Sequence, residues 1–452
     1  MTTTASRAAT VETLDHGLSR RPGQWIDGWD PENRDQWDAA GRPIARRNLA
    51  WSVFAEFLGF AVWALWSIVV PRLNGAGFAL TVDQMFWLVS TPSLVGATLR
   101  IPYTFAVPRF GGRNWTIVSA LLLLIPTAAL AWAVHHPELP FGVLVAIAAL
   151  AGFGGGNFAS SMANISFFFP AREKGAALGL NAAGGNIGTA AVQFAVPIVV
   201  VVGGGLALDR AGLMFVPLIV LAAFGAWKYM DNLSHAKADP RAYAVALKHP
   251  HTWLISFIYI GTFGSFIGYS GSFPTLLANL FPEVTLSLAF LGALVGSVTR
   301  PLGGSLSDRL GGALVTIVSF AAMALGAYGA ILGLRQQSFL LFFISFLWLF
   351  VFTGIGNGSI YRMIPAVFAG TAGPEPDALL HAGRAAAGCI GIAGAIGAFG
   401  GFLIPRGFAM STTATGGIEA ALWVLIGAYL FMGVLTWALY LRPGARLAAL
   451  KV

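Results

Sequence analysis

Charged side chains and cysteines are scarce in this sequence. Only 10% of its 452 residues are Asp, Glu, Lys or Arg, whereas 56% are hydrophobic. A soluble chain of this length would need many more charges on its surface, so a soluble protein is excluded. The single cysteine, Cys389, excludes an intrachain disulfide and leaves no cysteine cluster for a metal. The first residues contain no short apolar run, so we expect no cleaved signal peptide.

Catalytic and metal-binding patterns are also missing. The seven histidines all fall in the tail, in loops or in a polar central segment, and no nucleophile–base pair stands out. The glycine-rich stretch 152–170 follows an apolar helix and lacks the Lys-Ser/Thr of a phosphate-binding loop. We therefore expect no enzyme, no cofactor and no metal site. The net charge of +8 is scattered over loops, which is typical of membrane topology and argues against a nucleic-acid partner.

Long apolar runs are abundant. Runs of this length indicate an all-α polytopic membrane protein, because open sheets cannot satisfy their edge groups in lipid. Twelve spans are expected near residues 48–70, 83–107, 114–134, 141–169, 175–202, 211–230, 252–273, 286–307, 312–333, 338–362, 385–405 and 418–441. They define an amino-terminal segment (1–47), a first six-helix half (48–230), a linker (231–251), a second six-helix half (252–441) and a tail (442–452).

The distribution of lysine and arginine predicts the orientation of these spans. Both residue types concentrate in the amino-terminal segment, the linker, the tail and alternate loops, whereas the other loops hold single arginines. Because positive charges favour the cytoplasmic side, both termini should be cytoplasmic, with the protein in the inner (plasma) membrane. We expect membrane lipids as surroundings and a monomer as the working unit.

Two arginines interrupt the apolar spans at equivalent places. Arg100 and Arg300 begin the segments RIPYTFAVPRFGG and RPLGGSLSDRLGG, which match at an offset of 200 positions. Each precedes its loop arginine by nine residues, or about 13 Å of helix, which places it near the middle of a hydrocarbon core about 30 Å thick. Charges at this depth are costly and usually functional. Parallel repeats place substrate between the halves, so the pair predicts an anion site.

Other candidates lie in the same spans. Asn186 offers an amide to an anion, or a hydrogen bond to a neighbouring helix. Phe158 and the pair Tyr259 and Phe263, one helical turn apart, suit a flat anion, although such aromatics usually serve packing alone. Small residues in the glycine-rich helices allow close packing and sliding between helices. The glycines expected to act in packing or gating are Gly184, Gly185, Gly188, Gly394 and Gly397.

Glu56 is an isolated acid in the apolar run WSVFAEFLGFAVW. A carboxyl group buried without a partner favours its neutral form and could carry a proton. The alternative is a structural ion pair or hydrogen bond that locks helices together. The sequence leaves both interpretations open.

Several motifs together resemble the nitrate/nitrite porter family, NarK type, of the major facilitator superfamily. They are NFASSMANISFFFP (157–170), ALGLNAAGGNIG (177–188), TFGSFIGYSGSF (262–273), GGSLSDRLGG (303–312) and the glycine run 391–401. The resemblance implies nitrate bound between Arg100 and Arg300, with contacts from Asn186, Phe158, Tyr259 and Phe263. The chain departs from the family pattern at Ala182 and Ala183, where a Gly-Gly pair is common. It also departs at Glu56, where exchangers tend to be apolar.

The resemblance implies a nitrate/nitrite transporter that works by rocker-switch alternating access. Nitrate uptake in exchange for nitrite needs no titratable group and is favoured. Proton-coupled nitrate symport through Glu56 is the alternative, and transport of another small anion such as a carboxylate is a further one. A membrane sensor is disfavoured, because residues 1–47 are too few for a signalling domain.

Overall fold

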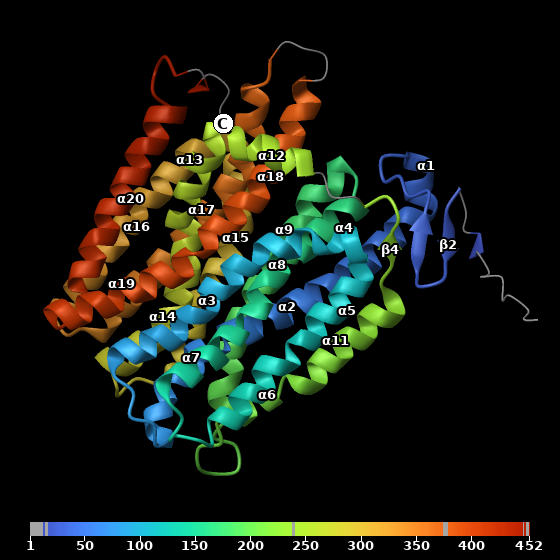
Figure 1. Cartoon of the computed structure of the whole chain (residues 1–452). Coiled ribbons are helices and arrows are strands. Elements are labelled where there is room, and N and C mark those ends of the chain that lie inside the picture. Colours follow the sequence, from blue (N-terminus) through green and yellow to red (C-terminus); the bar gives the residue numbers. More distant parts are fainter. Residues whose placement is uncertain (1–11, 14–16, 237–239, 374–377, 446, 449–451) are drawn as a thin grey trace, which may run out of the picture.

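The computed structural model describes residues 12–13, 17–236, 240–373, 378–445, 447–448 and 452. Parts of four predicted segments therefore lie outside the described residues. They are 1–11 and 14–16 of the amino-terminal segment, 237–239 of the linker, 374–377 of the second half, and 446 and 449–451 of the tail. The described residues form a largely helical molecule of two side-by-side groups of helices (Figure 1).

The first group contains the helices between residues 42 and 229. They are α2 (Arg42–Leu73), α3 (Val82–Thr104), α4 (Ala106–Phe110), α5 (Gly112–Leu122), α6 (Leu124–Ala133), α7 (Phe141–Leu150), α8 (Gly152–Phe168), α9 (Ala171–Val199), α10 (Arg210–Leu213) and α11 (Val216–Tyr229). Helix α3 begins at a capping box in which Thr81 accepts from the backbone of Gln84 and Gln84 accepts from that of Thr81. This cap fixes the start of the helix that carries Arg100.

The second group follows a short linker helix. Its elements are α12 (Pro240–Lys248), α13 (Pro250–Tyr259), the π-helical turn η3 (Ile260–Gly264), α14 (Ser265–Leu280), the 3₁₀ turn η4 (Leu286–Leu288), α15 (Phe290–Leu310), α16 (Gly312–Arg335), α17 (Phe339–Gly370), α18 (Ala378–Ala398), α19 (Gly400–Thr415) and α20 (Glu419–Tyr440). Within the described residues, eleven helical segments are long and apolar enough to cross a membrane, and the 23-residue α3 is a further long helix. The predicted all-α architecture of two six-helix halves is confirmed.

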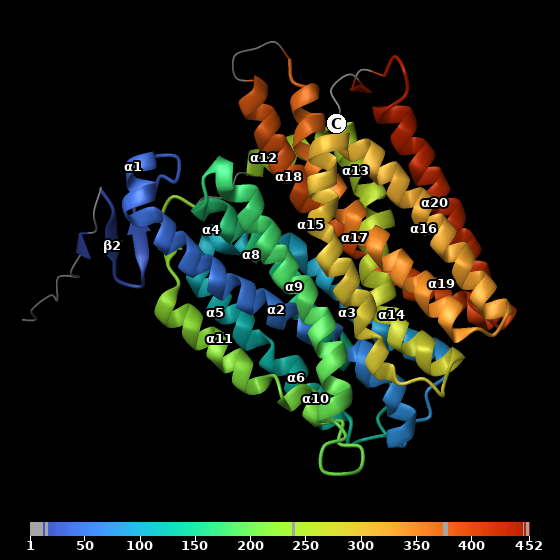
Figure 2. The same ribbon diagram turned by 180° about the vertical axis from the view of Figure 1, so that it is seen from behind.

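The two halves meet along several pairs of helices. Helix α3 packs against α18 and α19, α2 packs against α14, and α9 packs against α15. Figure 2 shows α9 beside α15 and α3 beside α14 from the back of the molecule. One inter-half hydrogen bond runs from Gln193 Nε2 to the carbonyl oxygen of Ser270, at 2.7 Å. The helix that carries Arg100 is therefore an interface helix.

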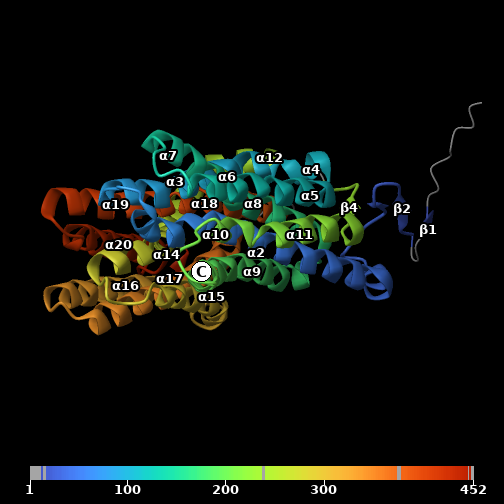
Figure 3. The same ribbon diagram turned by 90° about the horizontal axis from the view of Figure 1, so that it is seen from below.

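The amino-terminal segment folds into a small sheet that the sequence analysis did not anticipate. Its strands are β1 (Glu12–Thr13), β2 (Ser19–Arg21), β3 (Trp25–Asp27) and β4 (Asn232–Leu233), in the order β1-β2-β3-β4, and the short helices α1 (Arg34–Gln36) and η1 (Trp37–Gly41) lead into α2. Strand β3 pairs in parallel with β4, which directly follows the sixth span. Figure 3 shows this sheet at the end of the first half that is farthest from the second half.

Asp231 ties this sheet to the first span. Its buried carboxylate accepts hydrogen bonds from Arg47 at 2.6 Å and Asn48 at 2.8 Å, and it forms an ion pair with Arg20 at 3.3 Å. The loop at Gly111 packs against strand β4 of the sheet. The φ angle of Gly111 is +90°, and a Cβ at this position would lie 2.2 Å from Asn232 Oδ1. The described part of the segment thus forms a layer over one end of the first half.

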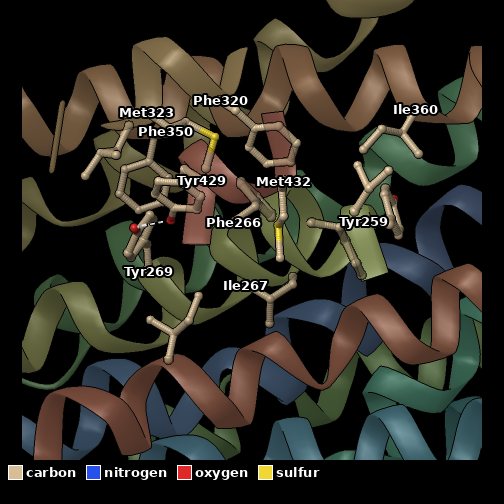
Figure 4. Close-up of a cluster of buried hydrophobic side chains, with 14 of the residues drawn as sticks. Tyr259, Phe266, Ile267, Tyr269, Phe320, Met323, Phe350, Ile360, Tyr429 and Met432 are labelled. Atoms are coloured by element: carbon tan, nitrogen blue, oxygen red, sulfur yellow. Dashed lines mark hydrogen bonds between the residues drawn. The ribbon is translucent and has the colours of Figure 1, made fainter. Parts of the chain in front are cut away.

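The core of the second half is largely aromatic. The hydroxyls of Tyr269 and Tyr429 are hydrogen-bonded inside it, beside Phe266 and Phe350 (Figure 4). Tyr259 lies at one end of the same cluster in Figure 4. This packing holds the turn η3 and its flanking helices in place beside the interface between the halves.

Candidate functional site

Arg100 of α3 reaches across the interface into the second half. Only 1% of the residue is exposed. Its Nε donates to the carbonyl oxygen of Gly155 at 3.1 Å, and its Nη1 donates to that of Gly394 in α18 at 2.6 Å. Its Nη2 is buried without a hydrogen-bond partner among the described residues. Two backbone carbonyls therefore hold the guanidinium in place and leave one nitrogen to bind a ligand.

Arg300 of α15 is held more loosely. The residue is 7% exposed, and its Nη2 donates to the Tyr259 hydroxyl at 3.4 Å. Its Nη1 is buried without a partner among the described residues. Its guanidinium carbon lies 5.0 Å from the centre of the Tyr361 ring. Each half thus contributes a buried cation with an unused donor.

One aromatic ring contacts both cations. The Phe263 ring centre lies 5.2 Å from Cζ of Arg100 and 5.9 Å from Cζ of Arg300. Phe263 belongs to η3, and such π-helical turns are frequent at functional sites. The ring of Tyr259 stacks on it at 5.2 Å, and that of Phe158 lies 6.4 Å away. The structure brings these predicted residues together around the arginine pair.

No arginine–carboxylate ion pair in the described part of the chain includes Arg100 or Arg300. The aromatic rings offset part of the cost of burying the cations, because guanidinium groups are attracted to ring faces. Neither guanidinium is in ion-pair contact with a carboxylate of the described residues, so the site favours an anion.

Asn186 carries unused hydrogen-bonding groups as well. The residue is fully buried in α9, and neither Oδ1 nor Nδ2 has a partner in the described structure. The alternative in which it bonds a neighbouring helix is therefore not what the structure shows. Buried amides are rarely left unpaired, so the group is suited to a ligand.

The candidate glycines divide into two groups. A Cβ at Gly188 would lie 2.2 Å from the Phe57 carbonyl oxygen, and Gly184 and Gly185 also pack against α2. These three mediate contacts inside the first half. Gly394 and Gly397 face the site instead, since a Cβ would lie 3.4 Å from the Tyr361 hydroxyl and 2.6 Å from Cδ1 of Tyr259, respectively.

Glu56 joins three helices through hydrogen bonds. Its Oε2 accepts from Ser161 Oγ at 2.6 Å, and Ser161 accepts in turn from Asn181 at 3.0 Å. Asn181 accepts from Ser52 at 2.9 Å, so this series of hydrogen bonds links α2, α8 and α9. Oε1 of Glu56 is buried without a partner among the described residues. The structural hydrogen bond considered from the sequence is present, and one carboxylate oxygen remains unused.

A cavity of about 380 Å³ leads to the site from one end of the molecule. Arg100, Tyr361 and Gly394 line its inner part, whereas Lys174, Tyr243 and Arg384 line its part near the linker helix α12. No Asp or Glu occurs among its described lining residues. Arg300 is not part of the lining either, and Tyr361 lies between it and the cavity. Of the two site arginines, Arg100 is therefore the one that an anion entering here reaches first.

Contacts between the halves close the opposite end. Arg406 of α19 forms an ion pair with Asp83 of α3 at 2.9 Å, and its guanidinium lies 4.2 Å from the Trp87 ring centre. Phe402 packs on Trp87 at 5.8 Å. The molecule is therefore open to the site from one end and closed at the other, which is the geometry of one state of an alternating-access transporter.

Three features of the site were missed from the sequence. Tyr361 was not singled out, although it lies in an apolar span next to an arginine. Trp63 lies 5.6 Å from the Arg100 guanidinium. The carbonyl oxygens of Gly155 and Gly394 are main-chain groups, so no residue type signals them. Within the described residues, no group of three or more potential metal ligands occurs.

Two six-helix halves around a central buried site define a secondary transporter of the membrane. The model of the Major Facilitator Superfamily matches residues 52–405, and the chain belongs to this superfamily and, within it, to the nitrate/nitrite porter family. It is 42% identical to the nitrate/nitrite transporter NarU of Salmonella typhimurium, covering 92% of this chain and 96% of the relative. It is 38% identical to the probable nitrate/nitrite antiporter NarK2 of Thermus thermophilus, covering 95% and 99%.

Solved structures share the fold. The crystal structure of a D-xylose-proton symporter superposes with a TM-score of 0.67 at 15% sequence identity, covering 87% of this chain and 97% of that one. The family assignment predicted from the sequence motifs is thereby confirmed, and the family is one of transporters rather than enzymes.

Proposed function

We propose that this protein carries nitrate and nitrite across the membrane by alternating access between its two halves. The observation that supports this most is the pair of buried arginines, one from each half, each with a guanidinium nitrogen that has no partner among the described residues. An anion that bridges Arg100 and Arg300 would satisfy both and would draw the halves together. The names of the relatives supply the two candidate anions.

The shape of the site favours a small, flat oxyanion. A guanidinium is a planar fork of donors that matches a planar anion with two or three oxygens. The rings of Phe158 and Phe263 lie nearly parallel, with 28° between their planes, and Asn186 adds an amide donor. Nitrate and nitrite have this shape and charge.

We infer that the open end faces the cytoplasm. Both described chain ends pack at this end: Arg113 donates to the Gly23 carbonyl oxygen at 3.5 Å, and the Ala313 amide donates to that of Val452 at 2.9 Å. Gly112 and Gly312 begin equivalent spans of the two repeats, so both contacts lie on one face. Positive charge gathers on the same face, as expected for the cytoplasmic side.

Uptake of labelled nitrate into proteoliposomes tests the proposal. Arg100→Ala and Arg300→Ala should each abolish uptake, because each removes one cation from the bridged anion. Arg335→Ala is the matched control, since Arg335 forms only an exposed ion pair with Glu419 at 3.0 Å. Uptake at the wild-type rate by either site variant would refute the proposal.

Exchange of nitrate for nitrite is the coupling mode that we favour. In the empty site, neither Arg100 nor Arg300 forms an ion pair with a carboxylate of the described residues, so reorientation is easiest when an anion is bound. One relative is named an antiporter. Neither Arg100 nor Arg300 needs to gain or lose a proton during this exchange cycle.

Proton-coupled symport is the second candidate, and the unpaired Oε1 of Glu56 is the observation in its favour. A nitrate gradient imposed on liposomes without internal nitrite separates the two modes. Exchange predicts no proton movement and little net flux. Proton uptake that disappears in Glu56→Gln would establish symport instead. In a separate test, inhibition of nitrate uptake by small carboxylates would extend the substrates to another class of anion.

A further inference from the structure

One more fully buried amide lies in a helix that contacts the site. Asn357 lies in α17, and neither its Oδ1 nor its Nδ2 has a hydrogen-bond partner among the described residues. Leaving a buried polar group unpaired costs about 1–3 kcal/mol, so such a group in a folded protein calls for an explanation. Arg100, Arg300 and Asn186, to which the proposed function assigns the anion, share this property.

The backbone on either side of Asn357 contacts the site. At Gly358, a Cβ would lie 2.1 Å from the carbonyl oxygen of Arg300, so α17 touches α15 at the arginine itself. At Gly356, a Cβ would lie 2.5 Å from the methyl carbon of Thr262, which precedes Phe263. Asn357 is therefore set between the helix of Arg300 and the turn of Phe263.

The face of α17 that carries Asn357 also carries Tyr361. Residues four apart lie above one another on a helix. Tyr361 contacts the Arg300 guanidinium and lines the cavity, so this face is directed toward the site.

The internal repeat shows why this amide is unpaired. The equivalent residue in the first half, Asn157, uses its Oδ1 to accept from Ser160 Oγ at 3.2 Å. The position equivalent to Ser160 is Ile360, which has no hydroxyl to donate. The first half thus satisfies its asparagine locally, whereas the second half lacks the local donor.

We propose that Asn357 is a further contact for the transported oxyanion, donating an Nδ2 hydrogen to it beside Arg300. Each half then supplies one arginine and one asparagine, Arg100 with Asn186 and Arg300 with Asn357. This inference rests on the proposed function, since it needs a small oxyanion between the arginines.

Nitrate binding by purified Asn357→Leu and Asn357→Asp proteins tests this role. Leucine has a similar volume and no polar group, and aspartate keeps the shape while replacing the donor by an acceptor. Thr353→Val is the matched control: Thr353 is buried one turn earlier on the same face, and its hydroxyl donates only to the Phe350 carbonyl oxygen, at 2.8 Å.

The readouts are the dissociation constant for nitrate and the rise in melting temperature that saturating nitrate produces. We expect the leucine variant to bind nitrate at least about tenfold more weakly, which matches the loss of one hydrogen bond to a charged group. We expect a larger loss in the aspartate variant and wild-type binding in the control. The aspartate variant decides the question if the leucine variant does not fold.

A wild-type dissociation constant in both Asn357 variants would overturn the assignment, as would a lowered melting temperature with an unchanged nitrate-induced rise. Either result leaves nitrate transport by the wild type standing. Absence of nitrate binding by the wild type would instead overturn the proposed function, and the role of Asn357 with it.

Discussion

Replacing each site arginine by lysine keeps the charge and removes the planar fork. Arg100 donates simultaneously to the carbonyl oxygens of Gly155 and Gly394 and has a third nitrogen left for a ligand. A lysine has one nitrogen, which cannot take all three positions. Arg300 has one protein acceptor, the Tyr259 hydroxyl, at a long 3.4 Å. The two substitutions should therefore differ in their effect on the empty carrier.

The magnitudes follow from the bonds that are lost. A hydrogen bond to a charged group contributes about 1.5–3 kcal/mol. Arg100→Lys loses at least one such bond to a carbonyl in the empty carrier, so its stability should fall by about that amount. Arg300→Lys loses only the long bond and should stay within about 1 kcal/mol of the wild type. Both lose a contact to the anion, which corresponds to about 10-fold to 150-fold weaker binding.

Thermal unfolding in detergent and nitrate titration measure the two effects separately. We expect weakened nitrate binding in both lysine variants and a clearly lowered melting temperature in Arg100→Lys alone. Nitrate binding within threefold of the wild type in Arg100→Lys would refute the reasoning, because charge without the fork would then suffice.

Two further predictions concern the closed end and the helix packing. Arg406→Ala removes an ion pair and a ring contact, which together contribute about 1 kcal/mol to the closed end. Labelling of a cysteine introduced at the interface residue Ser93 should therefore rise about fivefold. Unchanged labelling would contradict the assignment of this end as closed. Gly188→Ala forces a Cβ against the Phe57 carbonyl oxygen and should destabilise the protein by about 1–3 kcal/mol. Gly179→Ala in the same helix should leave the stability unchanged, because a Cβ there would have no described atom within 4 Å. Equal melting temperatures of the two variants would contradict the packing at Gly188.

The arginine pair could be predicted from the sequence because burying a charge in lipid is expensive. Arg100 and Arg300 stand out in apolar spans, and the repeat relates them, so their positions in facing halves followed without coordinates. The aromatic candidates were weaker predictions, since rings fill most membrane helices. Their convergence on the arginines depends on η3, a local π-helical turn with no residue signature.

Other features depend on long-range contacts that the sequence does not encode locally. The Gly394 carbonyl that holds Arg100 lies 294 positions away and is a main-chain group. The pairing of β3 with β4 joins residues on either side of six spans. Asn357 matches Asn157 at the repeat offset of 200 positions, but its lack of a partner among the described residues follows from Ile360 and from the packing around it. The glycines Gly184, Gly185 and Gly188 illustrate the same limit, because glycine spacing does not reveal which helix is the neighbour.

Counterflow in proteoliposomes tests the central claim most directly. Liposomes loaded with nitrite and diluted into labelled nitrate should accumulate label far above the level reached by liposomes without internal anion. The same liposomes containing Arg100→Ala protein should not accumulate it. Equal uptake with and without internal nitrite, or accumulation that persists in the Arg100→Ala protein, would contradict exchange through the arginine pair.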